Sequence, residues 1–292
     1  MKFSLSIKFN LVFLSIFAIA FVVSGWFARD LLRRTAMEET LQNARVLMQA
    51  ASAAQQYTAT QVTPLLKTQL KYDFVPQSVP AFSAVEILMK LEKNMSGYSY
   101  RSTMLDPTNP RDRPSQWETD IIHRLHDEPE LKELVGVKDT ASGAELYIAR
   151  PNRADNAACM QCHSVPSAAP KTLLDKYGSE HGFGWPLHEV IGADFVSVPM
   201  DIPIARSETL LQTFLLCLAA VFGVVLVVLN VIVHWVVTRR VRALSRAADA
   251  VSLGNLDDSD FVDNGSDEIA SLAVSFSRMK TSLVEAFKMI QA

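Results

Sequence analysis

The sequence predicts an α+β domain placed between two membrane-spanning helices and followed by a bundle of cytoplasmic helices. Two segments of the 292-residue chain are almost wholly apolar, and they bracket the region 29–209. This region mixes helical and strand patterns, whereas residues 238–292 carry apolar residues at heptad-like spacing. Helices beside a few strands are typical of an α+β fold with an antiparallel sheet.

The two apolar segments have the length of membrane spans. Residues 11–27 and 210–237 each approach the roughly 20 residues that a helix needs to cross a bilayer. The first follows Lys2 and Lys8, which is also compatible with a signal peptide, but its apolar stretch is long and no clear cleavage site follows. We therefore expect a retained helix at 9–28 and a second at 210–237.

The most informative motif is the run Cys159-Met160-Gln161-Cys162-His163, which has the spacing C-x-x-C-H. Two thiols at this spacing can add across the two vinyl groups of one haem, and the adjacent imidazole can then bind the iron from one face. The motif predicts one covalently attached haem c, with Cys159 and Cys162 as attachment residues and His163 as an axial iron ligand.

Other chemistries use a bare C-x-x-C pair. A structural zinc site normally needs four protein ligands, and the one remaining cysteine, Cys217, lies in the second apolar segment. A thioredoxin-like motif opens a helix after a strand and carries no histidine directly after its second cysteine. Haem attachment is favoured over both, and over a chance match or a simple disulfide.

Charge and chemistry together predict the topology. Four arginines follow the second span, which places the C-terminal segment in the cytoplasm (Arg239, Arg240, Arg242 and Arg246). Residues 1–8 then also lie in the cytoplasm, although three arginines beyond the first span favour the opposite orientation (Arg29, Arg33 and Arg34). Because haem is attached to C-x-x-C-H outside the bacterial inner membrane, we expect residues 29–209 to be periplasmic.

Patterns between the spans predict the elements of the domain. A long helix with Pro64 as a kink is expected first, then a second helix, a strand, a turn-rich loop, a third helix and two strands. Their predicted ranges are, in order, 33–71, 81–94, 98–105, 106–114, 118–133, 144–151 and 190–200.

The C-terminal segment carries two apolar stripes separated by a polar connector, 257–268. Two short helices cannot bury such stripes alone, but a parallel four-helix bundle made by two chains can. The segment resembles a HAMP domain in Gly254-Asn255-Leu256 and in Asp267-Glu268-Ile269, and a plain coiled coil is the alternative. The resemblance implies a homodimer. Since no output domain follows, signalling to a separate cytoplasmic protein such as a kinase or cyclase is expected.

Residues 40–200 resemble a family of periplasmic c-type haem domains with a PAS-like fold, often found ahead of HAMP. The resemblance rests on C-x-x-C-H and on runs such as 79–82, 147–151, 182–185 and 196–199. It implies a haem held against a small antiparallel sheet, with the long first helix closing the distal side. Some relatives ligate the iron with a cysteine on that helix, where this chain has none.

Several residues are candidates for further contacts with the haem. Tyr57 and Met48 on the first helix are the candidates for the sixth iron ligand, and three others could reach it by folding (His181, His188 and Met104). Arg101 and Arg150 could pair with the haem propionates, because guanidinium suits bidentate pairing. A solvated arginine or a surface ion pair is the alternative for each.

The sequence favours a sensor over other function classes. The alternative is a membrane-anchored electron-transfer cytochrome, in which a HAMP module has no evident purpose. An enzyme such as a haem peroxidase is less favoured, because the sequence offers no plausible distal His/Arg pair. The iron would detect redox state or a diatomic gas. With 28 basic and 31 acidic residues, giving a formal net charge of -3, nucleic acid is not expected as a partner.

Overall fold

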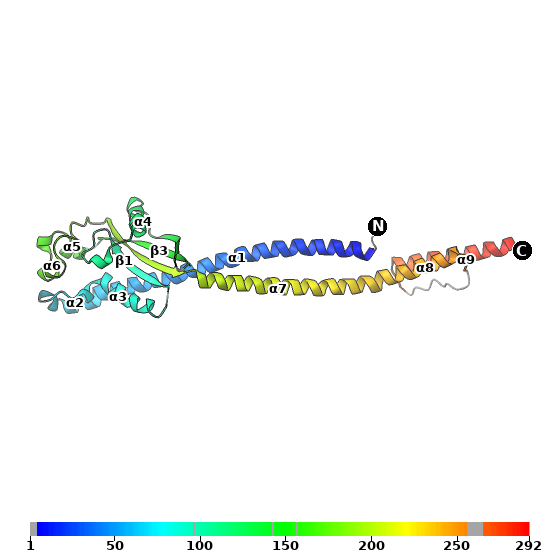
Figure 1. Cartoon of the computed structure of the whole chain (residues 1–292), viewed down its shortest axis with the longest axis horizontal. Coiled ribbons are helices and arrows are strands. Elements are labelled where there is room, and N and C mark those ends of the chain that lie inside the picture. Colours follow the sequence, from blue (N-terminus) through cyan, green and yellow to red (C-terminus); the bar gives the residue numbers. More distant parts are fainter. Residues whose placement is uncertain (1–4, 96, 142, 156, 256–264, 292) are drawn as a thin grey trace. The chain divides into compact units, whose positions relative to one another are not determined.

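The computed structural model describes residues 5–95, 97–141, 143–155, 157–255 and 265–291. The chain forms two compact units (Figure 1). One comprises Arg29–Thr209, and the other comprises Met1–Ala28 together with Leu210–Ala292. Helices α1 (Leu5–Tyr57) and α7 (Asp201–Ile232) contribute residues to both.

A four-stranded antiparallel sheet organises the unit Arg29–Thr209. Its strands are β1 (Ser99–Met104), β2 (Leu134–Thr140), β3 (Gly143–Arg153) and β4 (Val190–Pro199), in the order β1-β4-β3-β2. The predicted strands 98–105, 144–151 and 190–200 are confirmed. The register places Ser102 and Arg150 on either side of Asp194.

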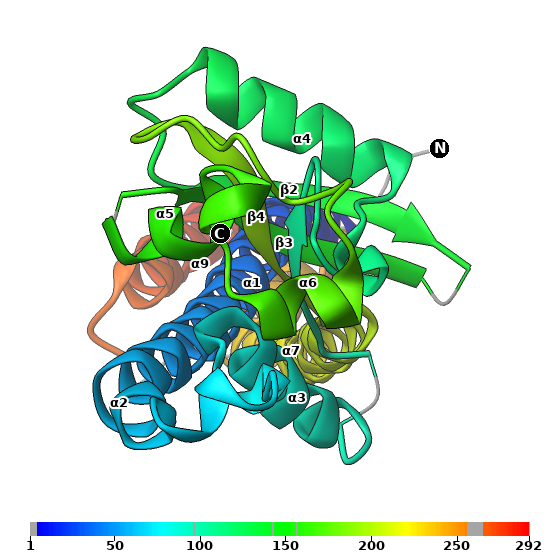
Figure 2. The same cartoon turned by 90° about the vertical axis from the view of Figure 1, so that its left-hand side faces the viewer.

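Alternating side chains give the sheet two apolar faces, each covered by helices (Figure 2). On one face, α1 and α3 (Pro80–Glu92) pack against a core that includes Met48, Leu146 and Val196. On the other, α4 (Gln116–Asp127) packs with Ile122 and Leu125. The predicted mixture of helices and an antiparallel sheet is therefore confirmed.

Prolines set several helix boundaries. The long first helix becomes π-helical over Thr58–Val62 before α2 (Thr63–Leu66), because Pro64 has no N–H for the helical ladder. The prediction of helix through residue 133 is wrong. Helix α4 starts with a Ser115 capping box and ends at Asp127, since Pro129 follows and the chain then enters β2.

The remaining elements are short. Two helices lie in the connection from β3 to β4, namely α5 (Ala157–His163) and α6 (Lys171–Tyr177). Single 3₁₀ turns occur at Gln69–Lys71, Pro76–Ser78, Pro110–Asp112 and Pro166–Ala168. Helix α6 docks on the chain that follows α2, where Thr172 Oγ1 donates to Leu70 O and Tyr177 meets Phe74 edge-on.

In the second unit, the apolar parts of α1 and α7 are long and apolar enough to cross a membrane, and none of the most apolar window of either is buried in the protein. They contact each other through a reciprocal pair of amide hydrogen bonds between Asn10 and Asn230, at 2.9 and 2.8 Å. Stacked rings of Phe17 and Phe222 lie 5.0 Å apart between the same two helices.

Beyond α7, a π-helical segment Val233–Thr238 leads into α8 (Arg239–Ser252), which contacts α9 (Glu268–Gln291). Asp267 caps α9 by accepting from Ala270 N–H and also pairs with Arg240 of α8. The hydrogen bond from Arg240 lowers the pKa of Asp267. Most of the predicted polar connector, with Leu256 before it, lies outside the described residues.

Candidate haem site

The C-x-x-C-H run forms the short helix α5 in the connection from β3 to β4. Residues three apart on a helix share a face, so Cys159 and Cys162 lie one turn from each other. Both are half-buried, and their thiols are not joined in a disulfide. Burial, and then the neighbouring Cys159, raise the pKa of Cys162, which keeps its thiol protonated at neutral pH.

His163 ends this helix with a defined ring orientation. Its Nδ1 lies 2.7 Å from Gly182 O, and since a carbonyl only accepts, Nδ1 carries the proton and donates. Burial lowers the pKa of His163, although the bond to Gly182 acts in the opposite direction. The ring is therefore a neutral imidazole whose Nε2 keeps its lone pair, the form that binds metal ions.

Trp185 and two glycines complete the surroundings of the imidazole. The Trp185 ring stacks on His163 with centroids 3.7 Å apart and planes 5° from parallel, which covers one face of the imidazole. Trp185 N–H donates to His163 O, and Gly184 N–H donates to Ser164 O. Gly182 and Gly184 have φ values of 84° and 71°, a region that favours glycine.

Direct chelation is a different use of such residues. Across the described ranges, no three or more His, Cys, Asp or Glu side chains are grouped so that they could hold a metal ion. Two thiols on one helix face and an imidazole with a free Nε2 instead fit the groups of a porphyrin, two vinyls and one iron.

Comparison with known proteins places most of this unit in a family. Residues 33–199, more than half of the chain, match the model of the Tll0287-like family. The chain belongs to the Tll0287-like family. Residues 232–285 match the HAMP domain, so a Tll0287-like haem-protein domain precedes a HAMP domain, as the sequence predicts.

A solved structure, described as the crystal structure of the cyanobacterial heme-protein Tll0287, is also similar. It is 13% identical, with a TM-score of 0.44, over 55% of this chain and 95% of that chain. No curated protein matches the sequence.

The two candidate distal ligands of the Tll0287-like domain have contrasting surroundings. Met48 is 1% exposed and belongs to the core between α1 and the sheet. Tyr57, the last residue of α1, is 64% exposed. Of the other candidates, His181 and His188 are exposed and face Asp106 and Asp155.

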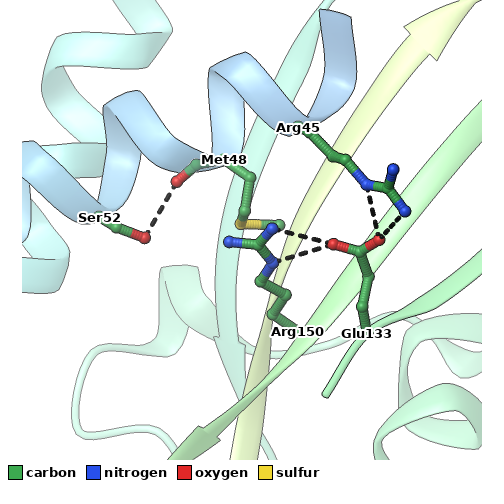
Figure 3. A network of polar contacts seen from close by, with 5 residues as sticks. All are labelled: Arg45, Met48, Ser52, Glu133 and Arg150. Atoms are coloured by element: carbon green, nitrogen blue, oxygen red, sulfur yellow. Dashed lines mark hydrogen bonds and ion pairs between the residues drawn. The ribbon is translucent and has the colours of Figure 1, made fainter. Parts of the chain in front are cut away.

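Both candidate propionate partners already contact carboxylates of the Tll0287-like domain. Arg101 pairs with the buried Glu118 at 3.0 Å. Arg150 donates through Nε and Nη2 to Glu133, which also accepts two bonds from Arg45 of α1 (Figure 3).

Two polar clusters of this domain were missed by the sequence analysis. Asp194 is buried in β4, where Gln55 Nε2 donates both to its Oδ2 and to the Tyr100 hydroxyl. Burial raises the pKa of Asp194. A single carboxylate within the apolar run 190–200 was a signal that could have found it. Asp106 contacts the loop that orients His163, and nothing local in the sequence indicates this.

Proposed function

We propose that this chain is a membrane-bound sensor that carries one haem c, attached through Cys159 and Cys162 and ligated by His163, and that signals through HAMP. The observation that carries the proposal is the bond from His163 Nδ1 to Gly182 O, because it fixes the tautomer with a free Nε2. When bound, the haem supplies an iron that can change redox state or take up a diatomic gas.

The order of the domains supports signalling rather than simple electron transfer. A HAMP domain follows the Tll0287-like domain in the same chain, and HAMP helices act as a two-state relay when they pair between two chains. The proposal therefore includes a homodimer and a separate cytoplasmic output protein such as a kinase or cyclase. A stimulus shifts the relay only if it favours one packing over the other.

The proposed topology follows the predicted ranges. Residues 1–8 and the HAMP segment 238–292 lie in the cytoplasm, 9–28 and 210–237 cross the bacterial inner membrane, and 29–209 lie in the periplasm. Reporter fusions to the C-terminal end check this arrangement. Activity of a C-terminally fused reporter that works only in the periplasm would contradict it.

For the sixth iron position, Tyr57 is a better proposal than Met48. Met48 would have to leave a packed core, at a cost of several kcal/mol for an emptied site, whereas Tyr57 is exposed beside a π-helical turn. The variants Tyr57→Phe and Met48→Leu separate the two, because the true ligand's loss changes the spin state in the absorption spectrum. Arg101 and Arg150 remain the proposed propionate partners, each pairing with a propionate through N–H groups that its protein carboxylate does not use.

The attachment is tested with the full-length protein made in a host that has a haem-attachment system. The pyridine haemochrome spectrum should show a thioether-linked haem that acid acetone does not extract. Cys159→Ser or Cys162→Ser should leave a single thioether, the double variant an extractable haem or none, and His163→Ala an altered spectrum. Cys217→Ser is the matched control and should behave as wild type. A freely extractable haem in the wild type would contradict the proposal.

Sensing is distinguished from electron transfer by coupling to HAMP. Cysteines placed on the apolar stripe of α8, formed by Leu244, Ala247 and Val251, report pairing between protomers through disulfide formation. Reduction of the iron, or addition of carbon monoxide or nitric oxide to the ferrous form, should change the cross-linking pattern. A pattern that stays the same in every state, with fast electron exchange, would favour the membrane-anchored cytochrome.

A further inference from the structure

The loop that receives the His163 hydrogen bond is held by a carboxylate from the loop that follows β1. Asp106 follows β1, 76 residues before Gly182. Its Oδ2 accepts from Gly182 N–H at 2.8 Å, and its Oδ1 lies 2.7 Å from His181 Nδ1. One carboxylate therefore contacts two successive residues, one of which provides the acceptor for the imidazole.

We infer that Asp106 is a positioning residue for the axial histidine, acting through the Gly182 backbone. The path has two hydrogen bonds, from Gly182 N–H to the carboxylate and from His163 Nδ1–H to Gly182 O. Asp106 does not touch the imidazole. It fixes where the Gly182 carbonyl stands and therefore how short and straight the His163 bond is. This inference rests on the proposed function, because it concerns His163 as an iron ligand.

Gly182 needs an anchor because its conformation is demanding. Its φ of 84° favours glycine, and a Cβ there would come within 1.9 Å of Thr108 Oγ1. The residue without a side chain has the widest choice of backbone conformations, so the Asp106 bond selects one of them. Thr108, in the same loop as Asp106, occupies the space that a side chain at residue 182 would need.

The expected consequence is a lower reduction potential of the iron. A firm bond from Nδ1–H to a carbonyl raises the basicity of a ligating imidazole, which favours the ferric state. Loss of a hydrogen bond that orients a metal ligand typically costs about 10- to 100-fold in metal affinity or activity. At the lower end, loss of Asp106 weakens the preference for ferric iron about tenfold, which for one electron corresponds to a rise of about 59 mV.

The test compares Asp106→Ala with Asp155→Ala in the full-length protein. Asp155 is a matched control because it also pairs with an exposed histidine, His188, at 3.3 Å, in the same connection between β3 and β4. Midpoint potentials are measured by spectroelectrochemistry, with haemochrome spectra and thermal unfolding recorded alongside. We expect the potential to rise by about 59 mV, which corresponds to a tenfold change, in Asp106→Ala. It should not change in Asp155→Ala.

Two further variants separate the contacts of Asp106. Asp106→Asn keeps a neutral acceptor oxygen for Gly182 N–H. It should therefore raise the potential by less than Asp106→Ala does. His181→Ala keeps the bond to Gly182 and should leave both the potential and the spin state unchanged. A shift in His181→Ala equal to that in Asp106→Ala would overturn the inference. If Asp106→Ala does not accumulate, Asp106→Leu, which also lacks an acceptor for Gly182 N–H, decides, and a wild-type potential there counts against the inference.

The outcomes distinguish this inference from the proposed function. A wild-type protein without covalent haem rejects the haem c proposal itself. If the wild-type protein carries covalent haem but Asp106→Ala and Asp155→Ala have the same potential, only the role of Asp106 is rejected. Hydrogen exchange of the 179–187 segment gives a second readout, since the Gly182 amide should exchange faster without its acceptor, and unchanged protection would also overturn the inference.

Discussion

Glu133→Ala tests whether a two-arginine contact fastens α1 to the sheet. Glu133 precedes β2, and its two carboxylate oxygens each accept two bonds, from Arg45 on α1 at 3.1 and 3.0 Å and from Arg150 on β3 at 3.1 and 2.9 Å. In Figure 3 the carboxylate lies between the two guanidinium groups. Removing it leaves two like charges facing each other without their shared partner.

The expected magnitude lies between those of exposed and buried ion pairs. The Glu133 side chain is 17% exposed, but Arg45 and Arg150 reach solvent at 43% and 28%. Exposed pairs contribute about 0.2–1 kcal/mol, and breaking a buried pair costs about 3–5 kcal/mol. We expect a loss of about 2 kcal/mol in unfolding free energy, or a Tm lower by about 4–8 °C for a unit of this size.

The pH dependence follows from the charge of Glu133. Burial alone raises the pKa of Glu133, but the hydrogen bonds from Arg150 and Arg45 outweigh it and hold the pKa below its ordinary value. A lowered folded-state pKa contributes stability above the unfolded pKa of about 4.3, and this is lost as pH falls through the folded value. The difference between Glu133→Ala and wild type should therefore shrink as the pH falls below the unfolded pKa of about 4.3.

Thermal unfolding of the full-length protein in detergent, followed by circular dichroism, measures both effects. Glu128→Ala is the control, because Glu128 pairs with Arg124 only at the exposed surface of α4. It should change the Tm by little. The reasoning fails if the two variants unfold at the same temperature, or if the Glu133→Ala difference persists undiminished in acid.

Variants at two further places, the Gly182 turn and the Asn10–Asn230 pair, test other contacts. Gly182→Ala should destabilise the protein more than Gly178→Ala, because both glycines have positive φ but only at Gly182 would a Cβ meet Thr108; strain alone costs about 1–3 kcal/mol. Equal thermal shifts would show that the contact is unimportant. Asn10→Leu removes the two bonds between the helices, while Asn230 keeps its bond to Leu226 O, and the cost should be about 0.6 kcal/mol. Denaturation in SDS should detect this loss of stability. The double variant Asn10→Leu with Asn230→Leu should lose less stability than the sum of the two single variants. A loss equal to that sum would contradict the prediction.

Local patterns predicted most of the elements of the fold. Alternation predicted β1, strand-like runs predicted β3 and β4, and the apolar spacing of 81–94 predicted α3. Strand β2 was missed because Gly136 weakens its pattern. In the structure Gly136 makes room for the Tyr147 ring of β3, whose hydroxyl would lie 2.5 Å from a Cβ there. Short helices such as α5 have too few turns to show a period.

The site was predictable only where its chemistry is contiguous. Cys159, Cys162 and His163 are adjacent in sequence, so their spacing predicted a haem motif before any fold was known. Contacts across the domain carry no such signal. Arg45 and Glu133 are 88 residues apart, and Asp106 and Gly182 are 76 apart. Their pairing depends on how the helices and loops assemble around the sheet.

The π-helical segment Val233–Thr238 sets the angular phase between α7 and α8. A π-turn holds one residue more than an α-turn, and each residue of an α-helix advances the side chains by about 100°. Because the π-turn takes up one extra residue, the side chains of α8 lie back by about that angle from where a regular α-helix of the same length would place them. The π-turn therefore works as a built-in offset, which decides which side of α8 continues the apolar face of α7.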